Sequence, residues 1–279
     1  MTGAQVLAAL GGSIIGFLVA RLWIPAAIER APTRLLRTNV DGQTVPAILG
    51  LPLAAGALVG IGFVYTLDRI SDRDLTTTRA ALACLVVLLV AGAAGYADDR
   101  RGDEVEQGFA GHLRAALGGR VTGGLVKIAG VGLAGAGAGL LLGGGWFTFE
   151  CAALVGLGAN LVNLFDRAPG RAAKAALVLA TPLVALGAGS WATAVAGIIG
   201  ALAGCIVADL HARAMLGDAG ANPVGGVLGL GLAVSLDRSG RLIALVLLLA
   251  ANLASERWSF SRGIERVPWL KSLDRWGRN

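Results

Sequence analysis

Nine apolar runs, each close to the length of a membrane-spanning helix, dominate this chain of 279 residues. A helix needs about 20 apolar residues to cross roughly 30 Å of hydrocarbon, and no soluble core calls for so many long runs. The composition agrees, because 55% of the side chains are hydrophobic, 15% are charged, and the mean hydropathy is +0.70. The sequence therefore predicts an all-α, polytopic transmembrane helix bundle of about nine to ten spans. The predicted spans are 3 to 22, 45 to 65, 80 to 97, 123 to 143, 147 to 164, 173 to 189, 191 to 208, 223 to 236 and 241 to 255.

Basic residues are unevenly distributed over the connections between these spans. If successive span ends alternate between two sides, one side carries 19 of the 24 Lys and Arg residues. The positive-inside rule makes that side cytoplasmic, with the N-terminus outside and the C-terminus inside. We therefore expect a multi-pass protein of the plasma (inner) membrane, with its polar loops in the cytoplasm. Since the net charge of +6 follows from this distribution, no nucleic-acid partner is expected.

An aspartate pair, Asp98 and Asp99, follows directly after the apolar run 80 to 95. Adjacent carboxylates at a membrane boundary repel each other, so the pair favours a shared cation or proton. The alternative is a solvated stop signal at the end of a helix. Lys127 lies one turn into the next span, where it either reaches the lipid headgroups or meets a lipid phosphate that enters from the bilayer.

A polar stripe marks the cytoplasmic end of the span at 147 to 164. Asn160, Asn163 and Asp166 recur every three residues, which places them along one face of a helix. Such a stripe either lines a binding site or joins neighbouring helices through hydrogen bonds.

The loop before the eighth span carries an aspartate between two glycines. Gly217 and Gly220 permit tight turns around Asp218, and Asn222 followed by Pro223 predicts an N-cap and a first-turn proline. A carboxylate beside a helix N-terminus can hold a hard cation while the helix end receives a phosphate.

The first cytoplasmic loop and the C-terminal tail complete the pattern. The turn-rich loop 37 to 46 predicts that Pro46 lies in the first turn of the second span. From Pro268 onward, Trp269, Leu273 and Trp276 fall at helical spacing, which predicts a short amphipathic helix on the cytoplasmic leaflet. A partner-binding role for the tail is the alternative. We expect two parts, a transmembrane domain at 1 to 255 and a cytoplasmic amphipathic tail at 256 to 279.

The order of these motifs is more specific than any of them alone. An aspartate pair after an apolar helix, then N-x-x-N-x-x-D, then G-D-x-G resembles the polyprenyl-phosphate phosphosugar (N-acetylhexosamine-1-phosphate) transferases. This family, of the glycosyltransferase family 4 type, includes phospho-N-acetylmuramoyl-pentapeptide transferase. The likeness extends over roughly residues 37 to 225. It implies a Mg²⁺-dependent enzyme that moves a sugar 1-phosphate from a nucleotide diphosphate sugar, of the UDP-N-acetylhexosamine type, to a polyprenyl (undecaprenyl) phosphate for cell-envelope glycan synthesis.

The resemblance also assigns roles to individual residues. Asp98 and Asp99 would engage the polyprenyl phosphate or help to deprotonate it, and Asp218, with Asp99, would ligate Mg²⁺. Asp166 would bind the nucleotide diphosphate sugar and Lys127 would contact phosphate. The remaining substrate-binding residues would be Asn160, Asn163, Arg171, Gly217 and Gly220.

The sequence departs from the family pattern at several positions. Family members often carry D-G-x-D-G where this chain has Asp166-Arg167-Ala168-Pro169-Gly170, and a serine where it has Ala221. No histidine follows Ser255, which argues against the muramoyl-pentapeptide substrate. The alternative is a catalytically altered relative that serves as a lipid-phosphate-binding scaffold in envelope assembly. The glycine-rich spans are compatible with a homodimer and equally with packing inside one bundle.

Overall fold

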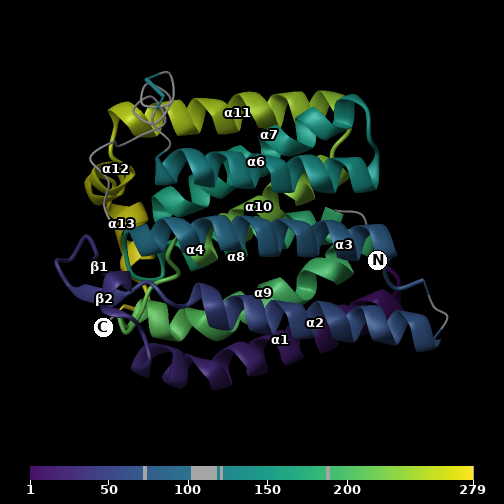
Figure 1. Cartoon of the computed structure of the whole chain (residues 1–279), viewed down its shortest axis with the longest axis horizontal. Helices are drawn as coiled ribbons and strands as arrows, with labels where there is room; N and C mark the ends of the chain where they lie inside the picture. The colour runs from purple at the N-terminus through teal and green to yellow at the C-terminus, as the bar shows by residue number, and fades with distance from the viewer. Residues whose placement is uncertain (72–73, 102–117, 120–121, 187–188, 279) are drawn as a thin grey trace.

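The structure, a computed structural model, describes residues 1–71, 74–101, 118–119, 122–186 and 189–278. Its long helices lie side by side in a single bundle (Figure 1). These helices are α1 (Gly3–Glu29), α2 (Gly50–Ser71), α6 (Gly123–Leu142), α7 (Trp146–Phe165), α8 (Arg171–Leu186), α9 (Gly189–Leu210), α10 (Asp218–Ser235) and α11 (Arg238–Arg257). One further long helix is built from α3 (Thr78–Val86), the π-helical turn η2 (Val87–Ala91) and α4 (Gly92–Arg101).

Seven of the described helices are long and apolar enough to cross a membrane. They are α1, α2, the continuous helix from α3 to α4, α6, α7, α9 and α11. The predicted spans at 173 to 189 and 223 to 236 coincide with α8 and α10, which have 16 and 18 residues. The protein is therefore an all-α bundle suited to a membrane, as the apolar runs predict. Most of the loop predicted at 98 to 122 lies outside the described residues.

The predicted position of Pro46 is wrong. Pro46 ends strand β2 (Thr44–Pro46), which pairs antiparallel with β1 (Leu36–Thr38), and α2 begins only at Gly50. The backbone N–H of Met215 donates to the carbonyl oxygen of Pro46 at 3.0 Å, so this segment is extended and paired with the loop before α10. A proline fits there because the contact uses its carbonyl group and needs no N–H.

The predicted start of the eighth span is also wrong. Helix α10 has Gly217 as its N-cap, and both Asn222 and Pro223 lie inside the helix. The cause is tertiary: carboxylates from two other helix ends accept hydrogen bonds from the backbone at the start of α10. The helix can begin earlier because its first N–H groups find partners outside the local sequence.

Glycines bring helices close together at two places that shape the bundle. A Cβ atom on Gly16 of α1 would lie only 2.3 Å from the carbonyl oxygen of Gly197 of α9. A Cβ atom on Gly95 of α4 would lie 2.2 Å from the carbonyl oxygen of Asp218. Only glycine permits such approaches, which increase van der Waals packing between helices in lipid. The second contact holds the end of α4 against the N-terminus of α10.

The tail forms two short helices, α12 (Phe260–Arg266) and α13 (Pro268–Arg275), so the predicted helix after Pro268 is confirmed. They lie at the same end of the bundle as the β-hairpin, away from the N-terminus (Figure 1). Three apolar side chains of the tail are largely exposed: Trp269 at 67%, Leu273 at 56% and Trp276 at 73%.

Candidate active site

Lys127 joins two of the predicted site aspartates at the end of the bundle that carries the hairpin. Its Nζ atom lies 2.8 Å from Oδ2 of Asp98 and 2.6 Å from Oδ2 of Asp218. All three side chains are mostly buried, with exposures of 18% to 20%. An ammonium group between two carboxylates offsets their mutual repulsion. We call Asp98, Lys127 and Asp218 the lysine cluster.

Asp99 caps helix α10. Its Oδ1 accepts a hydrogen bond from the backbone N–H of Asp218 at 3.1 Å, and its Oδ2 accepts one from Ala219 at 2.9 Å. The side chain is buried, and it meets the positive end of the helix dipole. Gly217, at φ 66°, leaves room for it, since a Cβ atom there would lie 2.8 Å from Oδ2 of Asp99.

This cap changes the expectation for the start of α10. The helix end was predicted to receive a phosphate, but the carboxylate of Asp99 occupies its N–H groups. The guanidinium of Arg37, from β1, donates to the backbone carbonyl oxygen of Asp99 and so links the first loop to the end of α4. The end of α4, the first loop and the start of α10 are therefore one connected unit.

Asp166, directly after α7, is the second carboxylate that holds this region together. Its Oδ2 accepts a hydrogen bond of 2.8 Å from the backbone N–H of Gly217. Burial raises the pKa of Asp166 well above its usual value of 3.8, and the charge of Asp209 raises it further. The hydrogen bond from Gly217 lowers this pKa but does not cancel the effect of burial.

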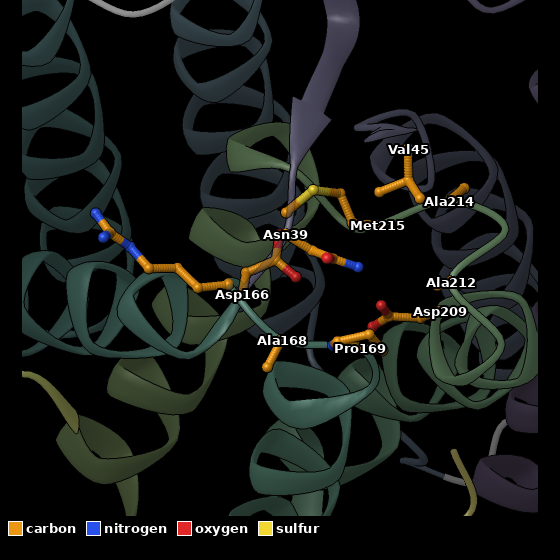
Figure 2. A pocket seen from close by; sticks show the side chains of 10 residues that line it. Asn39, Val45, Asp166, Ala168, Pro169, Asp209, Ala212, Ala214 and Met215 are labelled. Atoms are coloured by element: carbon orange, nitrogen blue, oxygen red, sulfur yellow. The ribbon is translucent and has the colours of Figure 1, made fainter. Parts of the chain in front are cut away.

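Asp209 is a site residue that the sequence analysis did not predict. Figure 2 shows Asn39, Asp166 and Asp209 around one small cavity of about 10 Å³, which has room for a single water molecule. Asp209 is only 2% exposed, and its Oδ2 has no hydrogen-bond partner among the described residues. The signal in the sequence was a carboxylate at the end of an apolar span, the same signal that identified Asp98 and Asp99.

Two other residues that were predicted to bind substrate contact side chains outside the lysine cluster. Asn160 donates from Nδ2 to Oδ1 of Asn252 on α11, at 2.5 Å. Nε of Arg171 lies 2.7 Å from Oδ1 of Asp274 in the tail. The Asn160 contact agrees with the alternative that the polar stripe joins helices, and Arg171 fastens the tail to α8. Asn163 is half-buried one turn before Asp166.

Gly220 is a close-packing position in the described structure. A Cβ atom on this residue would lie 3.1 Å from the Cα atom of Gly50, where α2 begins. Gly217 and Gly220 thus fix the path of the loop and of the first turn of α10. Their predicted role in substrate binding stays a prediction.

The lysine cluster also indicates which residues fit a divalent cation. The ammonium of Lys127 already sits between Asp98 and Asp218, so this position suits positive charge. Asp99, which was predicted as a ligand, instead turns both oxygens to the backbone of α10. No group of three or more His, Cys, Asp or Glu side chains with metal-binding geometry occurs within the described ranges. Asp98 and Asp218 are therefore the better-placed pair.

Comparisons with known proteins give no independent assignment. A search against protein-family models found no match, and a search of the curated proteins found none either.

Proposed function

We propose that this protein transfers a sugar 1-phosphate from a nucleotide diphosphate sugar to a polyprenyl phosphate at the membrane surface. The observation that supports this most strongly is the lysine cluster, in which carboxylates from two helix ends meet one ammonium group. Phosphoryl transfer depends mainly on positioned charges of both signs. The order of the motifs, which resembles the polyprenyl-phosphate phosphosugar transferases, supports the same reaction.

The lysine cluster suits an acceptor that enters from the bilayer. Lys127 lies in the first turns of an apolar helix, so a lipid phosphate can meet its ammonium group while the polyprenyl chain stays in hydrocarbon. Asp98, whose Oδ2 lies 2.8 Å from this ammonium group, is placed to accept a proton from that phosphate. In the proposed step, an oxygen of the lipid phosphate attacks the sugar-linked phosphorus. The bond between the two phosphates breaks, and a nucleoside monophosphate leaves.

The donor would lie on the other side of the α10 start, near Asp166 and Asn163. Asp98 and Asp218 would hold Mg²⁺, which when bound supplies positive charge against the diphosphate. Asp99 would act as a positioning residue, because it fixes the helix that carries Asp218. This end of the bundle would face the cytoplasm of an inner membrane, as the distribution of Lys and Arg predicts.

The proposal is tested by incubating the purified protein with undecaprenyl phosphate, Mg²⁺ and a panel of nucleotide sugars. We expect release of UMP with at least one UDP-N-acetylhexosamine, and loss of this release in Asp218→Asn. A matched control is Asp237→Asn, because Asp237 caps α11 at the other end of the bundle and asparagine caps equally well. Release of UMP with none of the donors, or full activity in Asp218→Asn, would contradict the proposal.

A second candidate function is a scaffold that binds lipid phosphate without turnover. It is favoured by the small size of the cavity beside Asp166, about 10 Å³, and by the pairing of Arg171 with the tail. The same assay separates the two functions. Binding of undecaprenyl phosphate that depends on Lys127, with no UMP release from any donor, would favour the scaffold.

A further inference from the structure

We propose that a second site, an arginine-lined cavity between the C-terminal tail and the first loop, binds a phosphate-bearing anion. The cavity has a volume of about 510 Å³, within the usual range for sites of small molecules. Its guanidinium groups come from Arg171, Arg262, Arg266, Arg275 and Arg278. This site is distinct from the lysine cluster, and the inference does not depend on the proposed transfer reaction.

Two of these arginines make no side-chain ion pair within the described part of the chain. They are Arg262 and Arg266, which lie four residues apart on α12 and so share one face of that helix. Among the described residues that line the cavity, Asp41 and Glu265 carry negative charge. Asp274 adds a third carboxylate directly behind the lining, where it pairs with Arg171 and Arg278. Five guanidinium groups therefore face three carboxylates, and the cavity carries an excess of positive charge.

The other arginines hold the cavity walls in place. The side chain of Arg171 is 7% exposed and makes a bidentate ion pair with Asp274. Its Nε lies 2.7 Å from Oδ1, and its Nη2 lies 2.9 Å from Oδ2. Its third nitrogen, Nη1, donates to Oγ of Ser261 at 2.7 Å. Lys174, one turn further along α8, donates to the carbonyl oxygen of Trp276 at 3.0 Å. The tail is thus fastened to the bundle, and Arg262 and Arg266 are presented by a positioned helix.

Phosphate is the ligand chemistry that this arrangement favours. Guanidinium groups match phosphate oxygens through paired, charge-assisted hydrogen bonds, and a phosphate carries more negative charge than a carboxylate. Two sources offer this group: a phospholipid headgroup and a soluble phosphate compound. The exposed Trp269, Leu273 and Trp276 lie on the same tail and would place it at headgroup depth.

Binding is measured on the full-length protein in phosphatidylcholine nanodiscs, in two arms. One arm titrates inorganic pyrophosphate, and the other adds phosphatidic acid to the nanodiscs and counts retained lipid by native mass spectrometry. Whichever of the two ligands the wild-type protein binds, pyrophosphate or phosphatidic acid, we expect the double variant Arg262→Gln/Arg266→Gln to bind it at least about tenfold more weakly. Glu265→Gln should bind more tightly, because it removes a negative charge from the lining.

The control is Arg213→Gln/Arg257→Gln, which removes two exposed arginines that do not line the cavity. Asp218→Asn, in the lysine cluster, should also leave the arginine-dependent binding unchanged, so this inference and the proposed transfer can fail separately. Binding of pyrophosphate alone or of phosphatidic acid alone would support the site and identify its source. Binding in neither arm, or equal losses in both double variants, would overturn it.

Discussion

Arg171 and Asp274 form a buried, bidentate ion pair that joins the start of α8 to the tail across 103 positions of sequence. Both side chains are nearly inaccessible, with exposures of 7% and 5%. Such a pair holds well only while both partners are present, because either charge alone would be buried without compensation.

Loss of Asp274 should therefore release the tail. In Asp274→Asn, Arg171 keeps its buried charge without a counterion, and we expect a cost of about 3 to 5 kcal/mol for tail docking. Limited proteolysis of the protein in nanodiscs should show faster cleavage between α11 and α13. The control is Glu265→Gln, which breaks only exposed ion pairs and should leave the protection of the tail nearly unchanged. Equal protection of Asp274→Asn and the wild-type tail would contradict the docking role of this pair.

The same pair predicts how tail docking depends on pH. Burial raises the pKa of Asp274, but the hydrogen bonds and charge of Arg171, with the charges of Arg278 and Lys174, bring it below the usual 3.8. A lowered folded pKa contributes stability above the unfolded pKa of about 3.9, and this is lost as the pH falls through the folded value. Protection of the tail from protease should be the same at pH 7 and pH 5, and should fall only below about pH 4. Loss of this protection between pH 7 and pH 5 would contradict the expected effect of Asp274.

Asp99 should contribute more to stability than an ordinary carboxylate. Asp99→Ala leaves two backbone N–H groups at the start of α10 without partners, with an expected cost of about 2 to 4 kcal/mol. Asp99→Asn keeps one acceptor oxygen and should lose about half of that. Thermal unfolding in detergent, followed by tryptophan fluorescence, gives the comparison. Glu29→Ala, at the exposed end of α1, is the control and should change stability by less than about 0.5 kcal/mol. If Asp99→Ala unfolds like this control, the cap is not formed.

Lys127 should compete with a divalent cation for its two aspartates. Lys127→Met removes the ammonium group and leaves Asp98 and Asp218 facing each other, so we expect Mn²⁺, a probe for Mg²⁺, to bind about tenfold more tightly. Electron paramagnetic resonance of free Mn²⁺ during a titration measures this. The double variant Lys127→Met/Asp218→Asn should lose the gain. If Lys127→Met binds no more Mn²⁺ than the wild type, the lysine cluster is not a cation site.

Asp166 should make the stability of the protein decrease as the pH rises, which is opposite to the effect of Asp274. Its folded pKa is raised by burial and by Asp209, so the protein loses stability as the pH rises from about 4 through the folded value. Asp166→Asn keeps an acceptor for the N–H of Gly217 and carries no charge. We expect this variant to melt at a higher temperature at pH 8, by about 2 to 4 °C for each kcal/mol regained, and to show less pH dependence. A lower melting temperature at pH 8 would contradict the expected cost of the buried carboxylate.

The helices could be predicted from sequence because a membrane imposes long apolar runs, and each predicted span overlaps a helix of the structure. The contacts between residues of the candidate site could not be predicted from the sequence. Asp99 bonds to the backbone of Asp218 across 119 positions, whereas rules for caps and helix faces act within about four residues. The start of α10 was misplaced for this reason, since Asn222 and Pro223 offered a local cap and the protein uses a remote one. Asp98, Lys127 and Asp218 were each predicted, but not their arrangement around one ammonium group.

The π-helical turn at Val87–Ala91 has a consequence for the aspartate pair. A π turn accommodates one more residue than an α turn, so all residues after it are rotated relative to a regular helix. One residue of an α-helix corresponds to about 100° of rotation, which is the difference between facing α10 and facing away from it. Deletion of a single residue in this turn would make the helix regularly α-helical, and the side chains of Asp98 and Asp99 would then no longer face α10. The orientation of the site is therefore encoded in the number of residues in this apolar segment as well as in the polar side chains.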